Sequence, residues 1–150
     1  MTQTINISYE HYTLDTLPAA DSELVKAAFE VTAQAYAPFS GFKVGAASRL
    51  QNGVIITAAN CESEVFPSGL CAERSLLYHY ASNYADNPIE AMAIASNPSE
   101  RECYPCGACR QVILDAENRQ QSPIRIVMAG GGTATIVSSA KDLLPFTFKL

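Results

Sequence analysis

The N-terminal part of the chain combines an alternating pattern with a helical one. Residues 4–9 alternate between polar and apolar side chains (Thr-Ile-Asn-Ile-Ser-Tyr), which predicts a short strand or arm. Apolar residues within 24–35 then recur at helical spacing, and Asp21 is a suitable N-cap for them. We therefore predict a helix from Asp21 through Tyr36, ended by Pro38.

A hairpin and then alternating helices and strands are predicted for the rest of the chain. Asn52-Gly53 suits a type I′ turn, which needs positive φ at both positions. The predicted elements are strands at about 43–50 and 54–59, a helix at 71–81, a strand at 89–96, a helix at 106–118, strands at 124–129 and 133–138 around a Gly-Gly-Gly turn, and a short turn at 141–144.

Strands that alternate with helices imply a central mixed sheet covered on both faces. The predicted fold class is therefore α/β, a three-layer α/β/α sandwich with about five strands. The sequence contains no internal repeat and no long linker, so we expect one domain over residues 1–150, with residues 1–20 as an N-terminal arm.

Composition narrows the range of functions. The chain has 150 residues, of which 48% are hydrophobic and 17% charged, as in globular domains. Its net charge is -5 with only 10 Lys+Arg, which argues against a nucleic-acid partner. No apolar stretch is long enough for a membrane span, and the polar N-terminus does not resemble a signal peptide, so we expect a cytoplasmic protein. In a reducing compartment, clustered cysteines more often bind metal or act in catalysis than form disulfides.

Two segments at predicted helix starts carry the candidate chemistry: Cys-Ala-Glu-Arg at 71–74 and Pro-Cys-Gly-Ala-Cys-Arg at 105–110. Thiolates are the species that bind zinc, and a helix N-terminus favours negative charge, so Cys71, Cys106 and Cys109 are candidate zinc ligands. Cys106 and Cys109 alone would also fit a structural zinc knuckle or a redox pair.

Three protein ligands leave one position of a tetrahedral zinc open, which is typical of a catalytic site. Water at that position can fall in pKa from 15.7 towards ~7. The spacing of Glu73 from Cys71 points it away from the ligand's own face, so we interpret it as a neighbour of the water and not as a fourth ligand. Arg74 is placed to hydrogen-bond the thiolates and to offset their charge.

Further motifs occur in order around these segments: Tyr-Ala-Pro-Phe-Ser-Gly-Phe-Lys-Val-Gly-Ala at 36–46, Asn-Cys-Glu at 60–62, and Leu-Leu-Pro-x-x-Phe at 143–148. Together with the cysteine segments, they resemble the zinc-dependent cytidine deaminases of the small, homotetrameric type. The resemblance covers about residues 36–148. It implies hydrolysis of cytidine and 2′-deoxycytidine to uridine and 2′-deoxyuridine in pyrimidine salvage, with Zn²⁺ as the cofactor.

The resemblance also implies roles for single residues. Glu73 would contact N3 of the base and carry protons, and the Ala72 backbone would help to hold the base. Asn60 and Glu62 would bind the ribose hydroxyls, and Phe42 would pack on the substrate. The resemblance implies further contacts from Phe66, which stands where relatives often have Tyr, and from Phe148, which would wall a neighbouring chain's site in a homotetramer.

Other interpretations remain open on the sequence. A deaminase that inactivates an aminonucleoside drug such as blasticidin S shares the cysteine segments, although Phe42, Asn60 and Glu62 favour a plain nucleoside. A polynucleotide deaminase fits poorly, because those relatives usually carry His-Ala-Glu and this chain is acidic. A structural zinc in a protein–protein module is the alternative outside enzymes. Asn60 and Glu62 could also be turn residues, Arg74 a surface ion-pair residue, and Phe42 or Phe148 core residues.

Overall fold

The computed structural model describes all residues, 1–150, and contains one mixed sheet in the strand order β1-β6-β5-β4-β2-β3. Neighbouring strands are antiparallel except β4 and β5, which are parallel. The sheet has six strands, one more than the sequence predicts. The strands are β1 Glu10–Thr13, β2 Lys43–Leu50, β3 Ile55–Ala59, β4 Ile89–Asn97, β5 Arg125–Gly130 and β6 Thr133–Val137.

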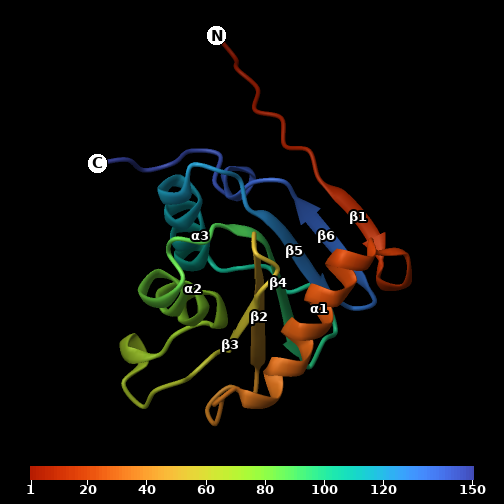
Figure 1. The fold of residues 1–150 in the computed structure, drawn as a ribbon, viewed down its shortest axis with the longest axis vertical. Helices are drawn as coiled ribbons and strands as arrows, with labels where there is room; N and C mark the ends of the chain where they lie inside the picture. The colour runs from red at the N-terminus through yellow and green to blue at the C-terminus, as the bar shows by residue number, and fades with distance from the viewer.

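Three α-helices cover the two faces of this sheet (Figure 1). Helix α1 (Ala19–Val31) lies on one face, and α2 (Ala72–Asn83) and α3 (Gly107–Gln120) lie together on the other. This arrangement confirms the predicted three-layer α/β/α architecture. None of these helices has both the length and the apolar composition that crossing a bilayer would require.

The predicted hairpin is present as β2 and β3, but its turn is not type I′, because Gly53 has a positive φ and Asn52 does not. Gly53 has a φ of +88°, a conformation that glycine adopts without steric cost, and its N–H donates to the carbonyl of Leu50 over 2.8 Å. The hairpin joins two strands whose register runs from Gly45 opposite Ala59 to Arg49 opposite Ile55.

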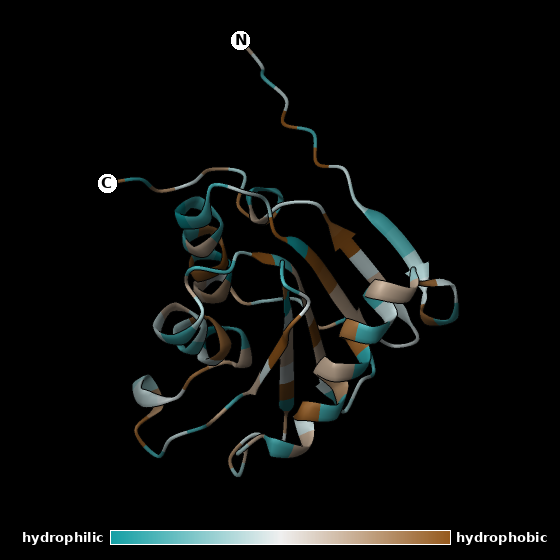
Figure 2. Cartoon of the chain, in the orientation of Figure 1, coloured by the Kyte–Doolittle hydropathy of each residue, from teal (hydrophilic) through white to brown (hydrophobic).

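The extra strand is β1, which follows residues 4–9, where the alternating pattern predicts a short strand or an arm. Residues 1–9 are extended but unpaired, and the pairing with β6 begins only at Glu10. Arg125 of β5 explains the position, because its guanidinium contacts the Glu10 carboxylate at 2.7 Å. Figure 2 shows β1 as a mainly hydrophilic strand, so its place in the sheet comes from pairing and charge.

The start of the first helix also differs from the prediction. Helix α1 begins at Ala19 with Pro18 as its N-cap, and Asp21 lies buried inside its first turn. The Asp21 carboxylate accepts hydrogen bonds from both Nε and Nη2 of Arg125. Because it pairs with this distant residue, Asp21 does not cap the helix. The helix ends at Val31, and a 3-10 turn at Thr32–Gln34 follows.

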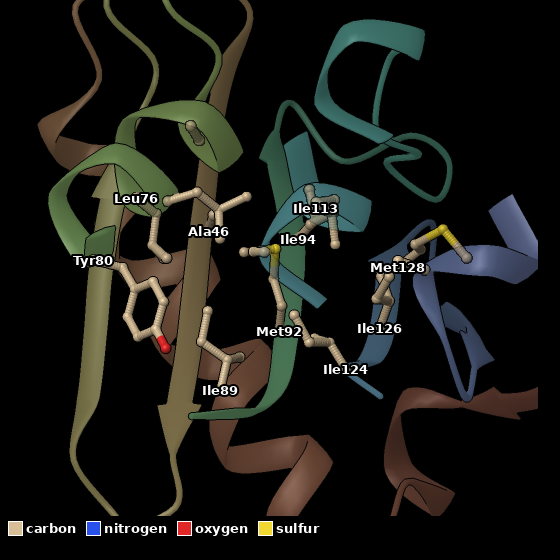
Figure 3. Close-up of a cluster of buried hydrophobic side chains, with 14 of the residues drawn as sticks. Ala46, Leu76, Tyr80, Ile89, Met92, Ile94, Ile113, Ile124, Ile126 and Met128 are labelled. Carbon is tan, nitrogen blue, oxygen red and sulfur yellow. The ribbon is translucent and has the colours of Figure 1, made fainter. Parts of the chain in front are cut away.

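The remaining boundaries agree closely with the predicted ones, and the core lies on both sides of the sheet. The larger cluster of 21 buried residues packs α2 and α3 against the sheet, and Figure 3 shows Leu76 and Tyr80 of α2 facing Ala46, Met92 and other sheet residues. A smaller cluster of 11 buried residues lies under α1.

The strand directions place the starts of α2 and α3 at one edge of the sheet. Strand β2 is antiparallel to both β3 and β4, so β3, β4 and β5 all run the same way. Helix α2 follows the carboxyl end of β3, and α3 follows that of β4. This edge is where α/β sheets usually bind their ligands.

Candidate metal centre and active site

The two cysteine segments meet at this edge because each forms the start of a helix. Cys71 is the N-cap of α2 and Cys106 the N-cap of α3, both with extended backbone, and neither side chain is used as a cap. Cys109 lies one turn into α3. Unpaired N–H groups at both helix starts favour negative charge on these sulfurs.

Cys71, Cys106 and Cys109 form one cluster, with all three Sγ atoms within 4.8 Å of one another. The Cys106 and Cys109 sulfurs are 3.4 Å apart. A tetrahedral zinc with Zn–S bonds of ~2.3 Å needs sulfurs roughly 3.8 Å apart, so the cluster has the size that zinc requires. Cys109 is fully buried, whereas Cys71 is half-buried and Cys106 exposed, which leaves one side of the cluster open.

The thiols of Cys71 and Cys109 titrate as a pair. A hydrogen bond from Cys109, helped by the cation of Arg74, lowers the pKa of Cys71 to about 5. The same hydrogen bond, together with burial, raises the pKa of Cys109. The protein therefore stabilises a thiolate at Cys71, the protonation state that binds zinc.

Glu73 lies next to this cluster and is almost fully buried, with 3% of its surface exposed. Burial, and then repulsion from the Cys71 thiolate, raises the pKa of Glu73 to about 7. Its Oε2 atom has no hydrogen-bond partner in the chain. A buried carboxyl with one oxygen free and a pKa near neutral pH is suited to proton transfer.

Arg74 contacts the cluster directly. Its Nη2 donates to Sγ of Cys71 over 3.6 Å, and its Nε is buried without a partner. The hydrogen bond to Cys71 raises the pKa of Arg74 further, so the side chain stays cationic. The sequence prediction of a cation beside the thiolates agrees with this contact.

Asn60 and Glu62 hold the segment that carries Phe42. The Asn60 side chain accepts from the Val44 N–H over 2.8 Å and donates to the Phe42 carbonyl over 2.9 Å. Oε1 of Glu62 accepts from the N–H groups of Phe39 and Ser40, each at 3.1 Å, and the Ser40 N–H lowers the pKa of Glu62 most strongly. Both residues also line a hollow of about 270 Å³ that reaches Cys71 and Arg74.

Of the other predicted contact residues, Phe66 lines the same hollow as Asn60 and Glu62. Ala72 is fully buried in the first turn of α2, while Phe42 is 44% exposed. Phe66 lies in a short 3-10 turn, packs edge-on against Phe39 at 6.1 Å and is mostly exposed. Phe148 is 73% exposed in a C-terminal segment that runs past α3, so it is not a core residue of its own chain (Figure 1).

A larger pocket of about 610 Å³ lies beside Phe42, and no sequence motif marks the other residues that line it. The connection from β4 to α3 supplies Pro98, Glu100–Tyr104 and the end of β4 supplies Ser96. Burial raises the pKa of the Cys103 thiol to about 11, so this cysteine is a neutral wall residue. Cys61, in contrast, is exposed.

Comparison with known families agrees with this site. Residues 18–122 match the model of the cytidine and deoxycytidylate deaminase zinc-binding region, which contains all three cysteines and Glu73. The chain belongs to this family of zinc-binding deaminases.

Individual relatives cover most of the chain. It is 31% identical to a cytidine deaminase of Mycobacterium tuberculosis over 138 residues, which are 89% of this chain and 94% of the relative. It is 38% identical to a cytidine deaminase of Halalkalibacterium halodurans over 93 residues, 61% and 68% of the two chains. The crystal structure of cytidine deaminase from Burkholderia pseudomallei has a TM-score of 0.71 and 34% identity, covering 84% of this chain and 97% of that one.

Proposed function

We propose that this protein hydrolyses cytidine and 2′-deoxycytidine to uridine and 2′-deoxyuridine, in pyrimidine salvage, with residues 1–150 acting as one deaminase domain. The observation that carries the proposal is the buried Glu73 carboxyl, with its free Oε2, beside three thiols that fit zinc and leave one side open. A structural zinc site needs neither the open side nor the neighbouring acid.

The three cysteines would hold the zinc ion, and bound zinc supplies a Lewis acid that makes water nucleophilic near neutral pH. Glu73 removes a proton from the attacking water and delivers it to N3 of the base as C4 is attacked. It then takes the remaining proton from the hydroxyl at C4 and gives it to the exocyclic amine, so that the C4–N bond breaks, ammonia leaves and the C4 oxygen becomes the carbonyl of the product. A pKa of about 7 lets the same carboxyl both accept and donate these protons.

Arg74 keeps the cluster effective as a catalyst. Three thiolates and one divalent zinc ion together carry a net negative charge. This charge would make the zinc ion a weaker Lewis acid. The guanidinium of Arg74, bonded to Cys71, and the N-termini of α2 and α3 offset the excess negative charge.

The nucleoside would bind between Phe42 and the cysteine cluster. Asn60 and Glu62 support the loop that presents Phe42, and Oε2 of Glu62 remains available to accept from a ribose hydroxyl. The first-turn backbone at Ala72 would hold the base against Glu73. A site that hydrogen-bonds hydroxyls discriminates against ligands without them, so free cytosine should be a poor substrate.

Assembly into a homotetramer would complete this site. Phe66 is 76% exposed in the turn before α2, and Phe146 and Phe148 are 85% and 73% exposed in the C-terminal segment, so a single chain leaves large aromatic side chains in water. Exposed apolar side chains that occur together, as Phe146 and Phe148 do along the chain, mark interaction surfaces. Phe148 would wall the base in a neighbouring chain, which excludes water from the reaction. The thiols favour a reducing, cytoplasmic compartment for the assembled enzyme.

The test is the loss of ultraviolet absorbance as cytidine becomes uridine, run beside dCMP, adenosine and blasticidin S. We expect turnover of cytidine and deoxycytidine, with little or none of the other three. Preferred turnover of blasticidin S would replace the proposal with a drug-inactivating deaminase. Full zinc occupancy without turnover of any of these would indicate a structural metal site.

A further inference from the structure

The outer wall of the large pocket is the connection between β4 and α3, residues 98–106, and this wall is fixed to the β5–β6 turn. The Cys103 N–H donates to the Ala129 carbonyl over 3.1 Å, and the Gly131 N–H donates to the Ser99 carbonyl over 3.0 Å. A Cβ at Gly130 would lie 2.0 Å from the Arg101 carbonyl oxygen, so this close approach requires glycine there.

Glu102 makes the side-chain contacts that hold the wall. Only 7% of its side chain is exposed, and its two oxygens have different partners. Oε1 accepts a hydrogen bond from the Thr133 hydroxyl at the start of β6 over 2.6 Å. Oε2 accepts one from the Tyr104 hydroxyl over 2.8 Å. The carboxylate therefore joins β6 to the residue just before Pro105 and the metal-binding cysteines.

Strand β1 reaches the same carboxylate from the N-terminal side. His11 Nδ1 lies 3.5 Å from Oε1 of Glu102 and 3.2 Å from the Thr135 hydroxyl. His11 lies outside residues 18–122, the part of the chain that matches the family. Glu102 and Tyr104 line both the large pocket and a second hollow that contains His11, so this segment borders the two.

We propose that Glu102 is a positioning residue that sets the shape of the nucleoside pocket by fixing Tyr104 and the wall around it. The inference rests on the proposed function, because it takes the pocket beside Phe42 to be one part of the nucleoside site. Glu102 is among the residues that line this pocket, but both of its carboxylate oxygens are engaged by Tyr104 and Thr133. We therefore assign its effect to these two partners and to the backbone of residues 99–103.

The metal ligands have supports of their own. Cys106 and Cys109 belong to α3, and Arg110 Nε donates to the Pro105 carbonyl over 2.8 Å immediately before them. Loss of the Glu102 hydrogen bonds should therefore shift residues 98–104 and weaken nucleoside binding, while the zinc ligands stay in place. The expected signature is a rise in KM for cytidine at nearly constant kcat and zinc content.

The experiment measures KM, kcat, zinc content and the thermal midpoint for four variants. Glu102→Ala removes both hydrogen bonds, and we expect KM to rise about 5- to 25-fold, since each net hydrogen bond is worth roughly a factor of five. Tyr104→Phe removes one hydroxyl and should give part of that rise.

Glu102→Gln keeps an acceptor for Thr133 and a donor for Tyr104, so its KM should stay near the wild-type value. Glu23→Ala, which removes a carboxylate paired with Arg49 on the α1 face, is the matched control and should leave KM unchanged.

A lower thermal midpoint in Glu102→Ala with unchanged KM would overturn the proposal, because Glu102 would then only stabilise the fold. If Glu102→Ala does not fold, Tyr104→Phe and Thr133→Val decide, and unchanged KM in both would overturn it equally. Phe42→Ala separates this inference from the proposed function. If KM rises in Phe42→Ala but not in the variants of Glu102, Tyr104 and Thr133, only the positioning role of Glu102 is refuted. An unchanged KM in Phe42→Ala refutes the assignment of the pocket itself.

Discussion

Arg74 donates a hydrogen bond from Nη2 to the sulfur of Cys71, three residues before it in the chain, over 3.6 Å. The contact spans the first turn of α2, so the helix itself aligns the cation with the thiol. Nε of Arg74 is buried without a partner, which means that no carboxylate competes for the guanidinium there. The charge of Arg74 is therefore directed at the cluster of cysteines.

Replacement of Arg74 by Gln should lower kcat with KM nearly unchanged, because the uncompensated thiolates make the zinc a weaker Lewis acid. We expect a loss of about 10- to 100-fold, the range that supporting contacts to metal ligands usually give. Arg74→Lys keeps the charge and should lose less. Steady-state kinetics with cytidine provide the check, and a large rise in KM at constant kcat would instead place Arg74 in substrate binding.

Cys71→Ala should lose zinc and activity together, since two remaining thiols at one helix start are too few for a catalytic zinc site. Metal analysis of the purified variant measures this directly. Cys61→Ala, which removes an exposed cysteine outside the cluster, is the control and should keep its full zinc content. A full zinc complement in Cys71→Ala would show that the ligand set is wrong.

Glu73→Ala should keep zinc but lose nearly all turnover. General acid–base catalysis alone is worth ~10²–10⁴-fold, and Glu73 would serve more than one step. Zinc content and kcat are measured on the same preparation, with Glu64→Ala as an exposed carboxylate control. Retention of a tenth of the wild-type kcat would exclude Glu73 as the group that carries the protons.

The stability of the metal-free protein should depend on pH through Glu73. Its pKa rises from 4.5 to about 7 on folding, so the folded state retains a proton that the unfolded state releases between these values. The stabilising contribution is therefore complete below about pH 4.5 and is lost as pH rises through about 7. Relative to Glu73→Gln, wild type should lose on the order of 3 kcal/mol of unfolding free energy across this window. Urea titrations of both proteins at pH 5 and pH 8 measure the difference; parallel behaviour would show that Glu73 is ionised throughout.

Deletion of residues 148–150 should raise KM for cytidine and spare zinc and folding, because Phe148 is exposed in its own chain and would act on a neighbour's site. Deletion of Lys149 and Leu150 alone keeps Phe148 and serves as the control. Sedimentation of the full chain should give a tetramer. A fully active monomer at micromolar concentration would contradict the shared site.

The positions of the zinc-binding segments could be predicted from sequence because local signals place them. Asn52-Gly53 defines the hairpin before α2, and Pro105 marks the start of α3, so the helices that carry Cys71 and Cys106 follow from nearby residues. The contact of Arg74 with Cys71 follows in the same way from helical spacing.

The features that the sequence did not predict depend on distant partners. Arg125 determines both errors in the N-terminal region, because it pairs with Glu10 in β1 and with Asp21 in α1. No periodicity within residues 1–36 contains that information. The contacts of Glu102 are of the same kind, since Thr133 and His11 come to it from opposite ends of the chain.

Because β3, β4 and β5 run in the same direction, their carboxyl ends all lie at the edge of the sheet that carries the cysteines. Their amino ends lie at the opposite edge, where a change to the chain is far from the site. The Asn52-Gly53 turn, the connection between α2 and β4 and the connection between α3 and β5 all lie opposite the starts of α2 and α3. Gly53 has open space around it, and the Gln51 N–H already bonds to the Pro88 carbonyl on that side. An affinity tag, fluorescent label or surface tether inserted at this turn would be separated from the thiols by the full length of the strands, so the enzyme could be immobilised with its pockets facing outward.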